Sequence, residues 1–131
     1  MATRAIIRFA TREEGVTFSA FPLKHHAQLY KHHDGDPESL GLDIANSIED
    51  GVSLDNIEID ALDLQRGDIN YIYYIWQCEE KSTWISIFKA DYNYCPSCGQ
   101  RDDECGEPPY ECIFVGEPRT LQDKFRDGKI V

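Results

Sequence analysis

The sequence has few basic side chains, and they are not clustered. Its 13 Lys and Arg residues are scattered among 24 Asp and Glu residues, which gives a formal net charge of −11 at pH 7. General binding to DNA or RNA needs clustered Lys and Arg, which displace counterions from the phosphates. We therefore expect no sequence-independent nucleic-acid binding. The acidity indicates either a solvated surface or a surface that meets a basic partner protein.

Long apolar runs are also missing. No stretch of 18 or more apolar residues occurs, so we expect no membrane span, and the start MATRAIIRFA lacks the features of a signal peptide. These observations predict a cytoplasmic protein with reduced thiols. With 131 residues, of which 41% are hydrophobic, the chain is expected to fold as one domain over residues 1–131 with a modest core.

Sequence motifs of common enzymes are absent as well. The chain has no Gly-rich phosphate loop, no nucleophile elbow and no HExxH motif. Cys78 lies beside Glu79 and Glu80, and neighbouring carboxylates disfavour the thiolate that a catalytic cysteine needs. We therefore expect that the protein is not an enzyme and acts by binding.

Cysteine is the residue type whose spacing indicates a specific chemistry. In the run CPSCGQRDDECGEPPYEC, over residues 95–112, the cysteines are Cys95, Cys98, Cys105 and Cys112. The segment from Cys95 to Gly99 resembles a zinc knuckle, because its tight turn brings two thiolates to one side of a metal ion. The four thiolates would form a structural Zn²⁺ site. The second half is not a CxxC motif, so a reduced loop, a local disulfide and an iron–sulfur site remain alternatives.

Hydrophobic periodicity predicts strands and helices along the rest of the chain. We predict strands at 4–10, 16–21, 27–32, 69–77, 83–89 and 113–115, with 16–21 pairing with the first strand and a hairpin joining 69–77 to 83–89. Residues 53–64 fit either a helix or a strand, and we favour a short helix.

Capping signals place the other helices. An apolar stripe predicts a helix with Asp36 as N-cap, Pro37 in the first position and Gly51 at the end. A last short helix would be capped by Thr120 and end at Gly128. These elements predict an α+β domain, with an antiparallel sheet that carries one or two helices on one face and with the Cys-rich, zinc-binding loop.

The turn between the third strand and the first long helix is a candidate ligand site. It presents Tyr30, His32 and Asp34 from a fixed scaffold, which is where binding side chains are often found. The alternative is that residues 34–37 only form the turn and begin the helix. A histidine metal site is disfavoured, because the adjacent histidines 25–26 and 32–33 would point to opposite faces of a strand.

The aromatic hairpin offers further candidates. Tyr71 and Tyr73 share one face, whereas Tyr74 and Trp76 share the other. One face covers the helices. The other would stack a base, close a homodimer, or belong to a second buried core. Arg119 and Arg126, near the predicted last helix, are the cationic candidates, because a guanidinium binds two phosphate oxygens at once.

The segment from Tyr30 to Glu38, followed by Leu40 and Gly41, resembles a pattern in small phage-encoded proteins. That pattern is an aromatic residue and then H-x-D-G-x-P, opening a helix with Leu-Gly; the run from Gly67 to Tyr73 is also similar. The resemblance covers roughly residues 4–90. Some proteins of this shape are phage inhibitors of bacterial Thoeris defence. The resemblance implies a non-catalytic anti-defence protein that sequesters a cyclic nucleotide or ADP-ribose-type signal in the host cytoplasm.

A different class of function follows from the acidity. The chain would then be an acidic protein-binding inhibitor of a host nuclease or CRISPR complex, whose basic channel it would occupy. Binding of that kind weakens steeply with salt, whereas nucleotide binding in a stacked pocket weakens less. We expect a homo-oligomer under the nucleotide hypothesis, because a small sheet leaves aromatic surface to bury.

The cysteine run gives a testable prediction. Replacing Cys95 and Cys98 by Ser should release Zn²⁺ and lower the melting temperature, because two of four ligands are lost and metal binding contributes to folding. Metal content by mass spectrometry and thermal unfolding under reducing conditions test this. A wild-type protein without metal and with the same melting temperature as the variant would contradict the zinc site.

Overall fold

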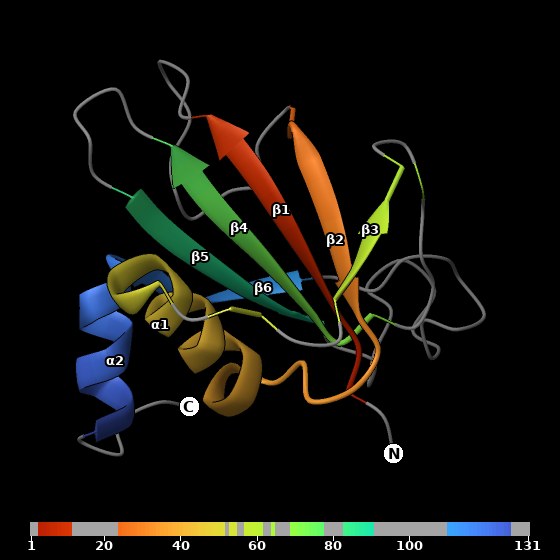
Figure 1. Ribbon diagram of the computed structural model, residues 1–131. Coiled ribbons are helices and arrows are strands. Elements are labelled where there is room, and N and C mark those ends of the chain that lie inside the picture. The colour runs from red at the N-terminus through yellow and green to blue at the C-terminus, as the bar shows by residue number, and fades with distance from the viewer. Residues whose placement is uncertain are drawn as a thin grey trace.

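The structure is a computed structural model that describes residues 3–11, 24–51, 53–54, 57–61, 64, 69–77, 83–90 and 110–126. Its elements are β1 (Ala5–Thr11), β2 (Ala27–Lys31), the π-helical turn η1 (Pro37–Gly41), α1 (Leu42–Asp50), β3 (Ile57–Asp60), β4 (Tyr71–Gln77), β5 (Thr83–Ala90), β6 (Tyr110–Gly116) and α2 (Pro118–Arg126). These elements form one sheet with helices beside it (Figure 1), which confirms the predicted α+β class.

The sheet has six strands in the order β3-β2-β1-β4-β5-β6. Each neighbouring pair is antiparallel except β1 and β4, which run parallel in the middle. The prediction of a purely antiparallel sheet is therefore wrong at this pair. Its strands are far apart in the sequence, and a parallel pair needs a long connection rather than a hairpin. Periodicity within a strand carries no information about that direction.

β1 has a neighbour on each edge. From Ala5 to Phe9 it pairs with β2 on one side, and along its whole length it pairs with β4 on the other. From the sequence, we predicted that a strand at residues 16–21 pairs with β1. Those residues lie outside the described part of the chain, and the edges of β1 from Ala5 to Phe9 are taken by β2 and β4.

The segment predicted as a helix at 53–64 contains strand β3 instead. Ile57 pairs with Lys31 and Asp60 pairs with Gln28, so β3 continues the sheet beyond β2. The alternation of Ile57 and Ile59 was the correct signal. The helical stripe was misleading because backbone hydrogen bonds to β2 stabilise the extended form, which local propensity does not register.

The hairpin prediction is confirmed, since β4 and β5 pair antiparallel from Tyr71 and Lys89 to Gln77 and Thr83. The predicted last strand also exists as β6. The last helix begins earlier than predicted, because the Leu121 N–H donates to the Glu117 carbonyl at 3.2 Å. Thr120 therefore lies inside the first turn of α2 and is not its N-cap, and Gly128 lies outside the described residues.

The start and the end of the first helical segment agree with the prediction in position. Asp36 is the N-cap residue and Pro37 follows it, but the Asp36 side chain makes no capping hydrogen bond. The Asp36 carbonyl instead accepts the N–H groups of Ser39 and Leu40 at 3.0 and 2.8 Å. Gly51 ends α1 with a left-handed φ of 72°. Within the described residues, no helix is long and apolar enough to cross a membrane.

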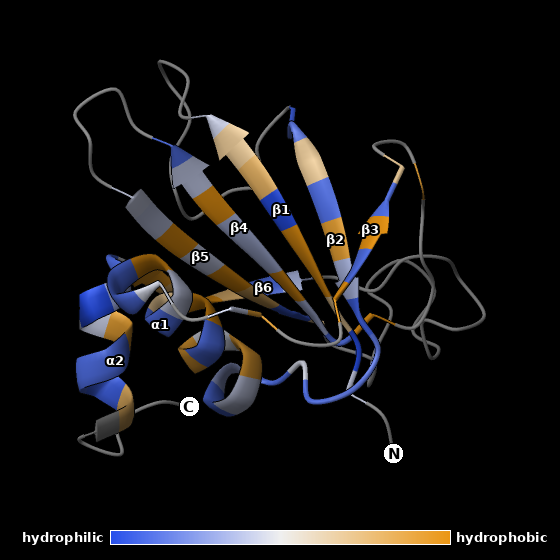
Figure 2. Cartoon of the chain, viewed as in Figure 1, coloured by the Kyte–Doolittle hydropathy of each residue, from blue (hydrophilic) through white to orange (hydrophobic). Residues whose placement is uncertain are grey.

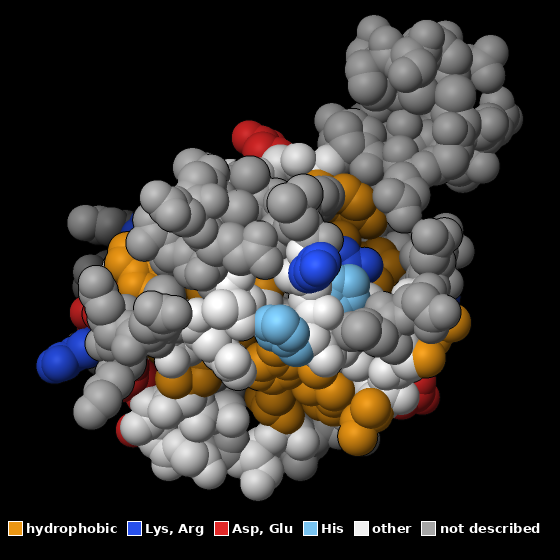
Figure 3. Space-filling view, turned by 90° about the horizontal axis from the view of Figure 1, so that it is seen from above, with side chains coloured by type: hydrophobic (Ala, Val, Ile, Leu, Met, Phe, Trp, Pro, Cys, Tyr) orange, Lys and Arg blue, Asp and Glu red, His pale blue; other side chains and the backbone are white. Residues whose placement is uncertain are grey.

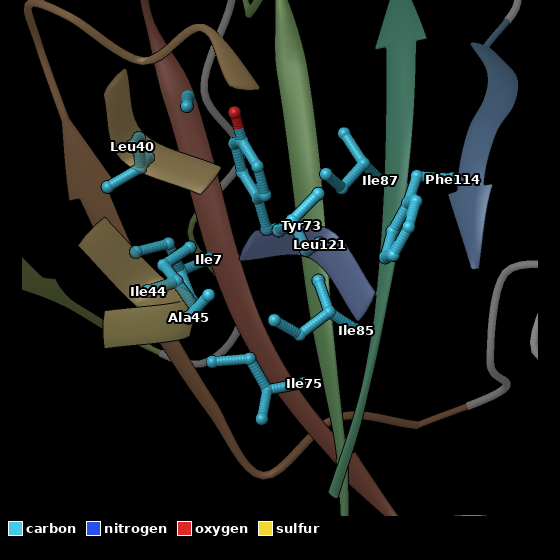
Figure 4. Close-up of a cluster of buried hydrophobic side chains, with 11 residues drawn as sticks. Ile7, Leu40, Ile44, Ala45, Tyr73, Ile75, Ile85, Ile87, Phe114 and Leu121 are labelled. Atoms are coloured by element: carbon cyan, nitrogen blue, oxygen red, sulfur yellow. The ribbon is translucent and has the colours of Figure 1, made fainter. Parts of the chain in front are cut away.

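Each face of the sheet contributes to a buried cluster, as the alternation of colours along the strands in Figure 2 indicates. The first cluster (Figure 4) joins the sheet to both helices, through Ile7, Tyr73, Ile75, Ile85, Ile87 and Phe114 and through Leu40, Ile44, Ala45 and Leu121. The second cluster comprises Ile6, Ala10, Tyr30, Ile69, Ile72, Tyr74, Trp76 and Phe88. The helices thus pack on one face of the sheet, as predicted. Both faces of the β4–β5 hairpin contribute to buried clusters, which was one of the alternatives for its aromatic residues.

Gly35 lies where the chain passes close to the start of β1. Its N–H donates to the Thr3 carbonyl at 2.9 Å. A Cβ atom on Gly35 would lie 2.7 Å from the Ala5 Cβ and 2.8 Å from the Thr3 oxygen, which are distances that force neighbouring atoms apart. The absence of a side chain therefore allows the turn before the helix to rest on the sheet. Gly41, by contrast, would keep ordinary contacts of 3.5 Å or more.

This contrast gives a matched pair of substitutions. Gly35→Ala should lower the free energy of unfolding by about 1–3 kcal/mol, because it overpacks a site bounded by backbone and a buried alanine. Gly41→Ala should be neutral or stabilising by up to about 1 kcal/mol, because Gly41 has helical dihedral angles. Urea unfolding of both variants tests the account. Equal stability of the two variants would contradict the close approach at Gly35.

Candidate functional site

The predicted ligand turn lies at the end of the sheet where β1 and β4 begin. The Tyr30 hydroxyl and His32 Nδ1 are hydrogen-bonded at 2.8 Å, and the His32 and His33 rings meet edge to face at 4.5 Å. Tyr30 is 6% exposed, whereas His32 and Asp34 are exposed. The structure therefore brings Tyr30 and His32 together, with Asp34 beside them on the surface.

The backbone of this turn is held firmly. Among the described residues, Asp34 is the one non-glycine residue with a positive φ, which is 56°. Asp tolerates this left-handed conformation better than most residues do. The next residue, Gly35, is hydrogen-bonded to Thr3 through its N–H and to Tyr73 through its carbonyl. The turn therefore presents exposed side chains from a fixed backbone.

Tyr73 supports the turn from inside the protein. It is fully buried, and its hydroxyl donates to the Gly35 carbonyl at 2.6 Å. Burial, and then the Asp36 carboxylate, hold the pKa of Tyr73 well above its ordinary value of 10.0. Tyr71 is half-buried, and the same two causes raise its pKa. Of these two predicted ligand residues, Tyr71 alone retains surface that a ligand could reach.

The two predicted arginines lie on α2, away from this turn in the sequence and in the contacts. Arg119 is exposed, and α2 packs against α1. Arg126 is the last residue of α2, and its side chain lies outside the description. α2 packs against α1 and β5, whereas Tyr30 belongs to β2 and His32 and Asp34 follow it. The predicted ligand residues therefore fall into two separate places.

A groove between α1 and α2 was not predicted from the sequence. It is a groove open to solvent with a volume of about 470 Å³, and it is lined by Leu42, Asn46, Asp50, Gln122 and Phe125. Gln122 Nε2 donates to Asn46 Oδ1 at 2.8 Å across the groove. Arg119 lies one helical turn before Gln122 on α2. Sequence analysis missed this site because it depends on how two helices far apart in the chain pack together.

A row of polar side chains crosses the opposite face of the sheet. Asp60, Gln28, Arg8, Tyr74 and Ser86 are in register on five adjacent strands. Arg8 Nε donates to Gln28 Oε1 at 2.9 Å, and Arg8 Nη1 donates to the Tyr74 hydroxyl at 2.6 Å. Ser86 Oγ accepts the indole N–H of Trp76 at 2.8 Å. In the sequence, the one feature that indicates this polar row is Arg8 within an otherwise apolar strand.

The other end of the sheet, where β1 and β4 end, carries basic groups. Figure 3 views the molecule from that side and shows Lys or Arg and His side chains close together beside apolar side chains. The Thr11 hydroxyl and His26 Nε2 are hydrogen-bonded there at 2.7 Å, and Lys24 is exposed before β2. This end therefore combines imidazole and ammonium groups in an otherwise acidic chain.

The predicted zinc loop is largely outside the described residues, which include neither Cys95, Cys98 nor Cys105. Cys112 lies in β6, half-buried, and its thiol donates to the Phe114 carbonyl at 3.6 Å. Burial raises the pKa of the Cys112 thiol. The residues that the structure describes contain no group of three or more potential ligands placed to hold a metal ion. The Cys-rich zinc loop therefore has no structural support and stays a prediction.

The Tyr73 phenol gives a pH-dependent prediction. Because its pKa is raised on folding, the neutral phenol favours the folded state below pH 10.0, and this stabilisation is lost as the pH rises beyond that value. At neutral pH, Tyr73→Phe should cost about 1–3 kcal/mol, because the buried Gly35 carbonyl loses its donor.

Urea unfolding between about pH 8 and pH 11 tests this. The wild-type midpoint should fall more steeply above pH 10 than that of Tyr73→Phe, which has no phenol to ionise there. Tyr71→Phe is the matched control and should change the pH dependence less, since Tyr71 is only half-buried. Parallel curves for wild type and Tyr73→Phe would contradict the buried phenol.

Comparisons with protein-family models, with curated proteins and with solved structures found no match for this chain.

Proposed function

We propose that the protein binds a nucleotide-type signal without altering it and so sequesters it. The observation that carries this proposal is the groove between α1 and α2, which combines an aromatic ring, a pair of amides and a carboxylate in about 470 Å³. Small-molecule sites have volumes of roughly 300–1,000 Å³ and combine apolar walls with a few polar groups. The groove has the size and the mixed lining expected of such a site.

The base of a nucleotide would occupy the part of the groove beside Phe125. An aromatic ring stacks on any base, and Leu42 adds apolar wall. Asn46 and Gln122 would read the edge of the base. Their mutual hydrogen bond uses one donor and one acceptor, and a primary amide offers two of each. The same bond orients both amides before a ligand arrives, which lowers the entropy cost of binding.

The sugar and the phosphate would occupy the polar parts of the groove. Asp50 is exposed at the lining and is suited to accept hydrogen bonds from ribose hydroxyls, as carboxylates do in other nucleotide sites. Arg119 lies one turn from Gln122 and would meet the phosphate. Binding would favour a ligand with few phosphate charges, because Asp50 and the negative net charge oppose additional ones.

Sequestration rather than turnover agrees with the chemistry of the lining. Apart from the Asp50 carboxylate, the lining consists of amide, leucine and phenylalanine side chains, which are neither acids or bases near neutral pH nor nucleophiles. The resemblance of residues 30–41 to phage proteins that sequester immune signals supports the same function. An anti-defence role in a host cytoplasm and a homo-oligomeric state belong to this proposal, although the aromatic residues predicted to close an oligomer are buried within the chain.

An acidic inhibitor that occupies a basic protein channel is the second candidate. It is favoured by the charges exposed in the described residues, where acidic side chains outnumber basic ones. The exposed carboxylates include those of Glu38, Asp43, Glu49, Asp50, Glu58, Glu111 and Glu117. Binding to a basic channel would fall steeply with salt. The two candidates therefore separate in one experiment in which salt is varied.

Native mass spectrometry with a panel of cyclic nucleotides and ADP-ribose derivatives tests the proposal. A bound nucleotide should be recovered with unchanged mass. By calorimetry, Arg119→Ala should weaken its binding by about tenfold, the equivalent of about 1.4 kcal/mol for a charged hydrogen bond. Lys89→Ala is the matched control, because it removes one exposed positive charge from β5, outside the groove.

Three results would count against nucleotide sequestration. They are the absence of any bound nucleotide, a nucleotide recovered with altered mass, and equal weakening by Arg119→Ala and Lys89→Ala. If no nucleotide binds, a salt-sensitive complex with a basic nuclease would establish the second candidate in its place.

A further inference from the structure

Arg8 lies in the middle of β1, on the face of the sheet opposite the helices. Its neighbour Ile7 belongs to the cluster under α1 and α2, whereas Ile6 and Ala10 belong to the second cluster. Side chains alternate along a strand, so Arg8 shares the second face with Ile6 and Ala10. Any site at Arg8 is therefore separate from the groove between the helices.

The guanidinium of Arg8 is held by neutral groups on both sides. Nε donates to Gln28 Oε1, Nη1 donates to the Tyr74 hydroxyl, and the guanidinium carbon lies 5.7 Å from the centre of the Tyr74 ring. Gln28 is 1% exposed and Tyr74 is 2% exposed. Both acceptors are thus packed side chains that cannot follow the guanidinium if it moves.

Gln28 is itself fixed by a second layer of hydrogen bonds. Its Nε2 donates to Asp60 Oδ2 at 3.1 Å and to the Leu64 carbonyl at 3.0 Å. Because both amide hydrogens are used in this way, Oε1 must face Arg8. The network therefore sets the orientation of the guanidinium through three strands, β3, β2 and β1, with β4 closing the other side.

Arg8 keeps donors that this network does not use. A guanidinium has five N–H groups, and the two hydrogen bonds leave one on Nη1 and both on Nη2. Within the part of the chain that the structure describes, no Asp or Glu carboxylate forms an ion pair with Arg8. A half-buried arginine normally has such a partner, since burial of an unpaired charge is costly. In a chain with a net charge of −11, a nearby carboxylate would be easy to supply.

We propose that Arg8 is the anchor of a phosphate-binding site on this second face of the sheet. The hydrogens left on Nη1 and Nη2 form the fork with which a guanidinium binds two oxygens of one phosphate. Gln28 and Tyr74 position this fork before the ligand arrives, and the phosphate supplies the direct ionic partner that no carboxylate of the described residues gives Arg8. The ligand is a free phosphate or the phosphate of a monoester.

Titration of the ¹⁵N-labelled wild-type protein with inorganic phosphate tests the proposal. The Nε–H signal of Arg8 should shift and saturate, and it should remain unshifted by sodium chloride at the same ionic strength. Phenyl phosphate in a parallel titration distinguishes the two ligand sources, because saturation by phenyl phosphate at lower concentration identifies a monoester site. A shift that grows linearly with phosphate and never saturates would overturn the proposal.

Two variants locate the site. Arg8→Lys keeps the charge but loses the fork, so it should weaken phosphate binding about tenfold or more. Arg4→Lys is the matched control, because Arg4 lies just before β1 and is also half-buried, and it should leave the affinity within about twofold. Equal affinities of Arg8→Lys and wild type would overturn the assignment to Arg8.

A third variant keeps the test decisive should Arg8→Lys fail to fold. Tyr74→Phe retains the ring and the volume but removes the hydroxyl that positions Nη1, so phosphate binding should weaken several-fold while Arg8 remains. An unchanged affinity in Tyr74→Phe would show that the arrangement around Arg8 does not create the site. Failure of the nucleotide to bind in the groove would leave these phosphate titrations unaffected.

Discussion

The parallel pairing of β1 with β4 fixes the order of the sheet and the positions of the side chains discussed above. It joins β1–β2–β3 to β4–β5–β6, each of which is held together by antiparallel pairs. The central position of β1 places Arg8 between Gln28 on β2 and Tyr74 on β4. The same pairing sets Tyr73 where its hydroxyl reaches Gly35 in the turn that starts on the other side of β1. A sheet with a different order would bring neither pair together.

The two faces of this sheet have different chemistry because side chains alternate along each strand. On the helix face, apolar strand residues hold α1 and α2 in contact, and the groove between the helices follows from that packing. On the other face, a polar row interrupts the apolar cluster and holds Arg8 by neutral partners. Buried polar groups are costly unless they are hydrogen-bonded, so a row this complete is a specific feature of the sequence. Recognition on either face would rely on side chains that are oriented before the ligand binds.

The sequence predicts the elements with strong local patterns and misses the features that depend on distant contacts. Repeating apolar residues and turn signals located β1, β2, β4, β5 and the helix that ends at Gly51, because those signals act within a few residues. The direction of β4 relative to β1, the strand at Ile57 and the groove beside Gln122 depend on partners distant in the chain. Tyr73 was predicted as a ligand residue from its place in an aromatic strand, and the structure places it in the core. No binding role was predicted for Arg8, because a single arginine in a strand matches no sequence motif.

Native-state hydrogen exchange of backbone amides, measured by NMR over a range of urea concentrations, tests the central pairing most directly. If β1 and β4 form the rigid centre, their slowest amides should exchange with the same free energy and the same dependence on urea, because they open together in global unfolding. The amides of the edge strand β3 should exchange at lower free energy. Separate opening of β1–β2 and of β4–β5, with two different free energies, would contradict the account, since Arg8 and Tyr74 would then not be held together in one frame.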